Sequence, residues 1–191
     1  MNVPPNASAT KRRILDAARR EFAQFGLAGA RIDRIADRAL ANKRSIYVHF
    51  GPKEHLFDLV VVDALATMSE AVPFTADDLP GYAGRLFDYL LSEPETLRLG
   101  TWASLERPQV AEGEMAAYRV KVEQLQRRYG SAATDVLVLT LGLVTAWQAG
   151  SPALAALEQS RANTAVIAAH RTRLVSGVAA LAANLGGFEA R

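Results

Sequence analysis

The stretch that decides the fold spans residues 31–50 and reads RIDRIADRALANKRSIYVHF. Apolar residues recur three and four positions apart on both sides of a short break, which is the spacing of amphipathic helices. We therefore expect one short helix over 31–39 and a second over 43–50, with Asn42 as the cap of the second. Two short helices joined by a tight turn form a helix-turn-helix arrangement.

The helix that precedes this pair can supply the surface on which both short helices pack. Thr10 can cap it and Gly26 should end it, because glycine tolerates the backbone angles found just after a helix. Its expected buried stripe consists of Ile14, Ala18, Phe22 and Phe25. The inward-facing positions expected on the pair are Ile32, Ile35, Ala36, Ala39, Ile46 and Phe50. Such packing leaves the polar side of 42–49 facing solvent.

The polar side chains that follow the turn are suited to a nucleic acid. Hydroxyl, amide and cationic groups donate to phosphates or read base edges, and arginine prefers guanine. The free backbone N–H groups at the start of the second short helix can also face a phosphate. The residues expected to bind DNA are Asn42, Lys43, Arg44, Ser45, Tyr47, His49 and Lys53.

Composition agrees with a nucleic-acid partner for one part of the chain. Residues 1–60 carry 11 Lys and Arg against 6 Asp and Glu, whereas residues 61–191 carry 11 against 14. A basic segment joined to a mildly acidic one suits a protein that contacts a polyanion through one part only. Cysteine is absent from all 191 residues, which excludes disulfides, thiol catalysis and thiolate metal sites.

Hydropathy gives no expectation of a membrane span. The longest uncharged stretch, 136–157, is interrupted by Gly, Ser and Pro at 150–152, and neither half reaches the roughly 20 apolar residues that a span needs. The first 13 residues lack the apolar run of a secretory signal. We therefore expect a soluble, cytoplasmic protein.

The remainder of the chain predicts further helices separated by Pro and Gly. Ala, Leu, Arg and Glu are abundant, and apolar residues recur at helical spacing. The expected helices are one that starts at Pro52 and ends before Pro73, followed by 79–92, 94–106, 112–129, 131–149 and 153–185. The expected fold class is all-α, with about nine helices in total.

Residues 10–56 resemble the amino-terminal domain of the tetracycline-repressor (TetR) family of bacterial transcription regulators. They read TKRRILDAARREFAQFGLAGARIDRIADRALANKRSIYVHFGPKEHL. The matching elements are Ile14-Leu15-Asp16-Ala17-Ala18, Phe22, Phe25-Gly26, Ile35-Ala36 and the run Ser45-Ile46-Tyr47-x-His49-Phe50-Gly51-x-Lys53-Glu54-x-Leu56. The resemblance implies a flexible arm over 1–9, a helix-turn-helix DNA-binding domain over 10–52 and a ligand-binding and dimerisation domain over 53–191.

The resemblance also assigns roles within the DNA-binding set. It places Tyr47, His49 and Lys53 against the phosphate backbone. It places Lys43, Arg44 and Ser45 nearest the bases, with Asn42 at the helix cap. The residues alone leave alternatives open: Tyr47 as a partly buried core aromatic, and His49 as a capping or surface histidine.

Three positions depart from the family pattern. Ala30 stands where the family has a Thr or Ser cap, and an alanine cannot accept a hydrogen bond from the helix, which costs roughly 1 kcal/mol. Leu40 and Ala41 occupy the turn where the family has a glycine and a large aliphatic residue, so Leu40 is strained if its φ is positive. Arg44 replaces a residue that is commonly glycine.

One short recognition helix buries too little surface for tight and specific binding, so such proteins act as twofold dimers. The dimer interface is expected on the last two long helices, at Val136, Leu139, Leu143, Ile167, Leu174, Val178 and Leu181. The alternative is that these stripes form the core of a single subunit. The large side chains able to line an effector pocket are Phe87, Tyr89, Trp102, Leu105, Tyr118 and Trp147, with Arg98, Glu106 and His170 as polar candidates.

The expected function is that of a sequence-specific transcription regulator, a repressor released from a palindromic operator by a small-molecule effector. Its expected partners are double-stranded operator DNA, a second copy of the chain and that effector, with no metal, cofactor or membrane. A helical DNA-binding or adaptor protein without an effector is an alternative. A helical-bundle enzyme is disfavoured, because His49, His55 and His170 form no metal-binding pair and no nucleophile or phosphate-loop motif occurs.

Overall fold

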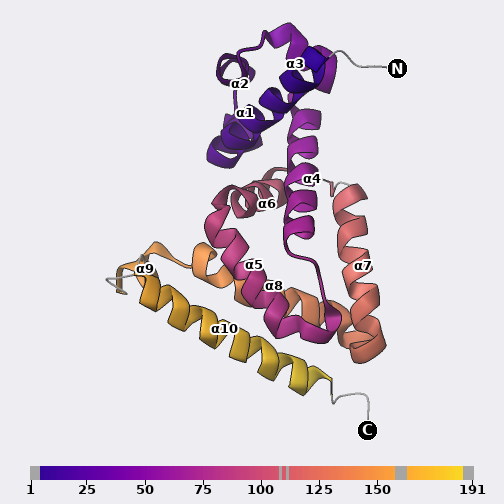
Figure 1. Cartoon of the computed structure of the whole chain (residues 1–191), viewed down its shortest axis with the longest axis vertical. Coiled ribbons are helices and arrows are strands. Elements are labelled where there is room, and N and C mark those ends of the chain that lie inside the picture. The colour runs from indigo at the N-terminus through magenta and orange to yellow at the C-terminus, as the bar shows by residue number, and fades with distance from the viewer. Residues whose placement is uncertain (1–4, 108, 111, 158–162, 187–191) are drawn as a thin grey trace. The chain divides into compact units, whose positions relative to one another are not determined.

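The computed structural model describes residues 5–107, 109–110, 112–157 and 163–186. Every regular element within those ranges is a helix, which confirms the all-α expectation (Figure 1). The α-helices are α1 (Pro5–Gly29), α2 (Ile32–Ala39), α3 (Lys43–Phe50), α4 (Lys53–Ala71), α5 (Leu79–Ser92), α6 (Pro94–Glu106), α7 (Glu112–Tyr129), α8 (Ala133–Ala149), α9 (Pro152–Leu157) and α10 (Thr164–Leu185). Two short 3-10 helices, η1 (Ala76–Asp78) and η2 (Gly130–Ala132), precede α5 and α8.

The helices divide into two compact units. The first comprises the described residues of Met1–Met68 and Glu93–Glu114, and therefore α1 to most of α4 together with α6. The second comprises those of Ser69–Ser92 and Met115–Arg191, and therefore α5, most of α7, and α8 to α10. The first compact unit thus contains two helices, most of α4 and α6, that lie beyond residues 10–52, the segment expected to form the DNA-binding domain.

The core of the first unit is built on α1. Ile14, Ala18 and Phe22 are fully buried, as the spacing predicted, and Phe22 packs edge-to-face on Phe57 with ring centroids 5.1 Å apart. The prediction for Phe25 is wrong, since this side chain is 37% exposed. Helix α1 loses its regular geometry at the next residue, where the φ of Gly26 is 69°, so the stripe turns away from the core there.

The two short helices pack as predicted. The buried positions of α2 are Ile32, Ile35, Ala36 and Ala39, and those of α3 are Ile46 and Phe50. All six join one hydrophobic cluster with α1, with the inner face of α4 and with Leu99 and Ala103 of α6. This cluster fixes the position of α3, because both of its buried side chains are anchored in it.

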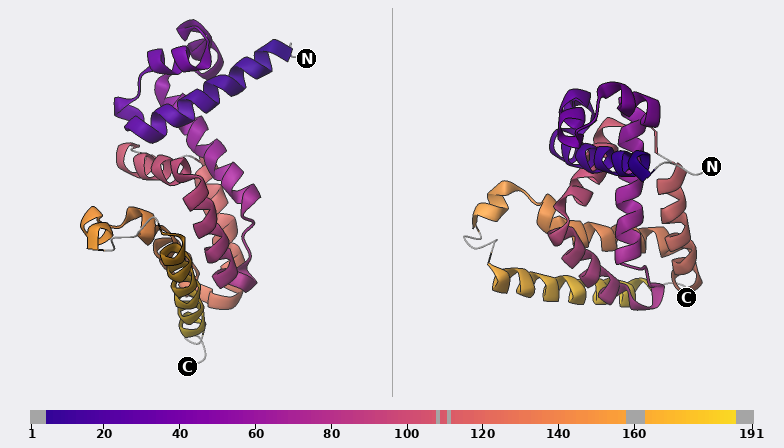
Figure 2. Two further views of the ribbon diagram at one scale, coloured as in Figure 1. Left: turned by 60° about the vertical axis from the view of Figure 1, so that its left-hand side comes forward. Right: turned by 45° about the horizontal axis from the view of Figure 1, so that its top comes forward.

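The second unit is organised around α5, α8 and α10. Helix α10 packs along both α5 and α8, and α5 also packs on α8 (Figures 1 and 2). Leu86 and Phe87 of α5, Val136 and Val144 of α8 and Val178 of α10 are buried. An ion pair between Arg171 and Asp88, 2.8 Å long, joins α10 to α5 at the edge of this packing.

Several helix boundaries differ from the predictions. Helix α1 runs to Gly29, although its geometry is non-helical at Gly26, the residue expected to end it. Helix α1 begins at Pro5 rather than Thr10, which is compatible with the preference of proline for the first position of a helix. The segment expected as one helix over 153–185 is two helices, α9 and α10. Asn163 caps α10, and its side chain accepts a hydrogen bond of 2.8 Å from the backbone N–H of Ala165. Residues 158–162 lie outside the described part of the chain.

Candidate nucleic-acid interface

Helix α3 is positioned by its two ends and its buried face. Asn42 caps it as predicted, since its side-chain oxygen accepts a 2.7 Å hydrogen bond from the backbone N–H of Ser45. Gly51, with φ 72°, ends the helix, and its N–H donates to the carbonyl of Tyr47. Ile46 and Phe50 hold the inner face in the core.

The opposite face of α3 is open to solvent. Tyr47 is 50% exposed, so it is no core aromatic within this chain, and His49 is exposed beside the ring of Phe50. Arg44 is also exposed. Arg44, Tyr47 and His49 are therefore all exposed, as predicted, whereas Ser45 is partly buried. The apolar side chain of Val48, 72% exposed, lies among them. Lys43 leans toward α2, where it forms an ion pair with Asp33.

A hollow of about 470 Å³ lies beside this surface, between the start of α2, α3 and the start of α4. Tyr47 and Lys43 line it from α3, Lys53 from α4 and Arg31 from the segment before α2. Two carboxylates, Asp33 and Glu54, also line the hollow, and Asp33 is paired with Lys43. Three cations against two carboxylates leave an excess of one positive charge beside the phenol of Tyr47, which suits a phosphate oxygen.

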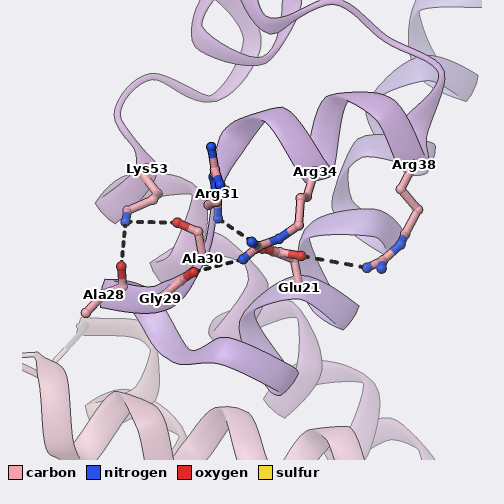
Figure 3. Close-up of polar contacts among 8 residues, drawn as sticks. All are labelled: Glu21, Ala28, Gly29, Ala30, Arg31, Arg34, Arg38 and Lys53. Atoms are coloured by element: carbon pink, nitrogen blue, oxygen red, sulfur yellow. Dashed lines mark hydrogen bonds and ion pairs between the residues drawn. The ribbon is translucent and has the colours of Figure 1, made fainter.

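The N-cap of α2 is Arg31 rather than Ala30, the position expected from the sequence, and its side chain makes no capping hydrogen bond. The buried carboxylate of Glu21 takes over this role from α1. It accepts a 3.0 Å hydrogen bond from the backbone N–H of Arg31 and a 2.7 Å hydrogen bond from Nε of Arg34 (Figure 3). Arg38 approaches its other oxygen at 3.9 Å, which is an ion-pair contact but too long for a hydrogen bond.

Sequence reasoning missed Glu21. The signal was present, because Glu21 lies seven residues after Ile14 and next to Phe22, at a position that the helical period places on the buried face. A carboxylate there needs partners, since an unpaired buried charge costs several kcal/mol. Arg34 supplies one of them, and it also donates to the carbonyl of Gly29 at 2.9 Å.

Two further helices hold the connection between α1 and α2. Lys53 of α4 donates to the carbonyl of Ala30 at 3.2 Å and to that of Ala28 at 3.5 Å (Figure 3). The carboxylate of Glu106, at the end of α6, accepts hydrogen bonds from the backbone N–H groups of Leu27 and Ala28. Lys53 is therefore a brace for this connection as well as a candidate phosphate ligand.

The turn between α2 and α3 has the geometry that makes Leu40 strained. The φ of Leu40 is 50° and its ψ is 46°, the left-handed conformation that glycine adopts most easily. Its side chain is 80% exposed and gains nothing from packing that offsets this cost. The backbone N–H of Ala41 donates to the carbonyl of Ala36, which closes the turn.

The residues expected to line an effector pocket do not gather at one place. Trp102 packs on the core of the first unit, and Leu105, also on α6, is 72% exposed. In the second unit, Phe87 and Trp147 flank the ring of His170, with centroids 5.5 Å and 4.3 Å from it. The two remaining side chains of the set are Tyr89, which is partly buried, and Tyr118, which is 39% exposed.

The residues expected at the dimer interface separate into two groups. Val136, Leu174 and Val178 are buried within their own unit, so the prediction that they form an intersubunit surface is wrong. Leu139 and Leu143 are 47% and 39% exposed. The other two residues of the set, Ile167 and Leu181 on α10, are partly buried.

Helix α8 carries a second apolar face opposite its buried one. Val138, at 59% exposure, joins Leu139 and Leu143 there, and a side chain at Gly142 would meet nothing within 4 Å. The helical run Glu112–Ala149 contains a window of mean hydropathy 1.4, which is enough by composition to span a bilayer, and only 28% of that window is buried. No membrane span was expected from the sequence, and this run is long and apolar enough for one by length and composition alone, as a core helix of a soluble protein can be.

Comparisons with known proteins match both parts of the chain. Residues 14–60 match the family described as bacterial regulatory proteins of the tetR family. Residues 78–179, more than half of the chain, match the family described as the tetracyclin repressor-like C-terminal domain. The amino-terminal match covers the helix-turn-helix elements and Lys53.

Individual proteins similar to this chain are also transcription regulators. The transcriptional repressor SCO4008 of Streptomyces coelicolor is 48% identical over 98 residues, 51% of either chain. The repressor NicS of Pseudomonas putida is 36% identical over 96 residues, 47% of this chain and 45% of NicS. The chain thus matches about half the length of these curated relatives. The crystal structure of SCO4942 of Streptomyces coelicolor, assigned as a transcriptional regulator, is 37% identical with a TM-score of 0.78, over 90% of this chain and 97% of the other.

The two family matches and the likeness to SCO4942 agree with the geometry of α3, whose inner side is buried and whose polar side chains are exposed. This chain therefore belongs to the tetracycline-repressor family of bacterial transcription regulators.

Proposed function

We propose that this protein is a homodimeric transcription repressor that inserts α3 into the major groove of a palindromic operator and is released by a small-molecule effector. The observation that carries the proposal is that α3 is anchored by Ile46 and Phe50 while its polar face is open to solvent. The relatives SCO4008 and NicS, which are both named as repressors, support the direction of regulation.

The proposal divides the exposed residues by their reach. Arg44 and Ser45, in the first turn of α3, are proposed to meet base edges, since arginine favours guanine. Tyr47, His49 and Lys53 are proposed to contact phosphates, and the hollow that Tyr47 and Lys53 line supports this for those two residues. Lys43 reaches a base or a phosphate once it leaves Asp33, a surface ion pair of small net value.

The dimer is proposed to form through the exposed apolar face of α8 together with the small residues of α10. Ala179, Ala180 and Ala183 are exposed on α10, and small side chains let helices approach closely. The proposed cover is a second subunit and not lipid, because members of this family are transcription regulators that bind DNA. Two recognition helices then lie about 34–36 Å apart, or one turn of DNA.

The effector is proposed to enter the second unit, which matches the C-terminal domain of the family. The alternative of a DNA-binding or adaptor protein without an effector is separated by a thermal-shift screen against metabolites, since a protein without an effector gains no stability from any of them. A catalytic role is not proposed, and a cytoplasmic location follows from access to DNA.

The proposal is tested by sequencing DNA that the purified full-length protein selects from a random pool. We expect a short palindrome with two half-sites. Arg44→Ala should relax the preference at particular positions of each half-site, whereas Lys53→Ala should weaken binding to every sequence and lower the salt slope by about one. Arg127→Ala, which removes an exposed cation from α7, should change neither. Selection without any enriched sequence would sink the proposal.

A further inference from the structure

The second unit buries a cation among aromatic rings. Lys121, on α7, is only 9% exposed. Its ammonium lies 6.0 Å from the ring centroid of Phe74, 5.9 Å from that of Tyr82 and 5.7 Å from that of Tyr118. These rings come from three separate segments, namely the stretch before η1, α5 and α7, so the fold assembles the cluster rather than a local sequence repeat.

This cation has no counter-ion within the part of the chain that the structure describes, since no carboxylate lies within ion-pair distance of Lys121. Burial lowers the pKa of its amine, which shows that the site disfavours the charge. Lysines are rarely buried unless they are paired, and contact with ring faces recovers only part of the lost hydration. A methionine or leucine would fill the same space without this cost.

The cluster also offers a neutral hydrogen-bond donor. Tyr82 is 1% exposed, and burial, together with the nearby Tyr118, raises its pKa to about 12. Like any tyrosine, it is protonated at neutral pH, and its O–H can donate to an anion. An ammonium and a protonated phenol beside apolar ring faces suit a carboxylate whose remainder is apolar.

We propose that Lys121 is the counter-ion for a small monocarboxylate with an apolar body, and that this acid is the effector of the repressor. One cation matches one negative charge, and a phosphate dianion would remain half neutralised in a cluster whose described residues bring a single cation. The binding site stands on the ring cluster alone, whereas the role of the acid as effector rests on the proposed function.

The test uses pairs of molecules that differ only in charge: benzoate with benzamide, phenylacetate with phenylacetamide, and octanoate with octanamide. Binding to the full-length protein is measured by calorimetry and thermal shift without DNA. We expect at least one acid to bind at least tenfold more tightly than its amide. Lys121→Met should weaken that acid about tenfold or more and leave the amide unchanged. Arg119→Met, which removes an exposed cation two residues away, should bind the acid as the parent protein does.

The outcomes are separable. If no acid is preferred over its amide, or if Lys121→Met binds the acid as well as the parent protein, the site is overturned. A ligand-free Lys121→Met protein that melts at a lower temperature than the parent would identify Lys121 as a structural cation and would also count against the site. An acid that binds but leaves operator DNA in place overturns the effector role alone. Loss of operator selection in the earlier experiment concerns the repressor function and leaves the binding result intact.

Discussion

At the scale of single residues, the carboxylate of Glu21 combines three duties. It closes the start of α2, it compensates Arg34, and it sits within ion-pair distance of Arg38, all while fully buried. Glu21→Gln should therefore lower the free energy of unfolding by about 2 kcal/mol, because the amide leaves Arg34 without its charge partner.

Chemical denaturation with an unchanged m-value measures this loss. Asp16→Asn is the matched control, because it also neutralises a carboxylate on α1, but one that is 61% exposed and 3.8 Å from Arg12. We expect the control to change stability by less than about 0.5 kcal/mol. Equal effects in the two variants would show that Glu21 has no special role.

Leu40 is expected to cost the protein stability. Leu40→Gly should raise the free energy of unfolding by about 0.5–1 kcal/mol, since glycine relieves the left-handed strain and the lost side chain is exposed. Ala41→Gly, at a neighbouring position with ordinary φ, should instead destabilise by a similar amount. Thermal unfolding of both variants checks the pair, and a destabilised Leu40→Gly contradicts the argument.

Residues with one dominant local interaction were predictable. Asn42 as the cap of α3 follows from chemistry within a few residues. The strain at Leu40 was expected only on the condition that the turn has a positive φ, and the cap of α2 lies at Arg31, one residue after the expected position. The partners of Lys53 and Glu106 did not follow from the sequence, because they join segments 23 to 79 residues apart. Only the folded chain brings such groups together.

At the scale of helices, the exposed face of α8 should determine whether the dimer forms. Leu143→Glu places a charge on its exposed apolar face, where a second subunit would have to bury it. We expect the dimer dissociation constant to rise by at least about tenfold. Analytical ultracentrifugation measures this constant. Leu154→Glu, at a 64% exposed leucine on α9, should leave it unchanged. A dimer that tolerates Leu143→Glu would place the interface elsewhere.

Helix α8 also shows where spacing stops being informative. In a helix with one apolar face, the spacing of the apolar residues predicts which side is buried. Helix α8 is apolar on both faces, so its spacing did not show which of Val136 and Leu139 belongs to the core and which to an interface. The break between α9 and α10 escaped prediction for another reason: residues 158–163 read EQSRAN and contain no Pro or Gly, so only Asn163 marked the start of α10.

At the scale of the whole molecule, stability should decline at alkaline pH. The pKa of Tyr82 is raised to about 12 in the folded protein by burial, against 10.0 for an ordinary tyrosine. The unfolded chain releases this proton first, so stability is complete below pH 10 and falls as the pH rises toward 12. Tyr82→Phe should flatten this part of the profile in urea titrations between pH 9 and 12. A profile identical to that of the parent protein would assign the decline to other groups.

The hydrogen bonds from the backbone N–H groups of Leu27 and Ala28 to the carboxylate of Glu106 predict where mutations that abolish repression will fall in the gene. A screen for alleles that have lost repression will return changes at codon 106 alongside those at codons 42 to 49, although the two stretches are distant in the gene. Such alleles will still produce abundant protein with an intact recognition helix. Substitution at that codon is expected to change operator occupancy while leaving unchanged the residues proposed to read the bases.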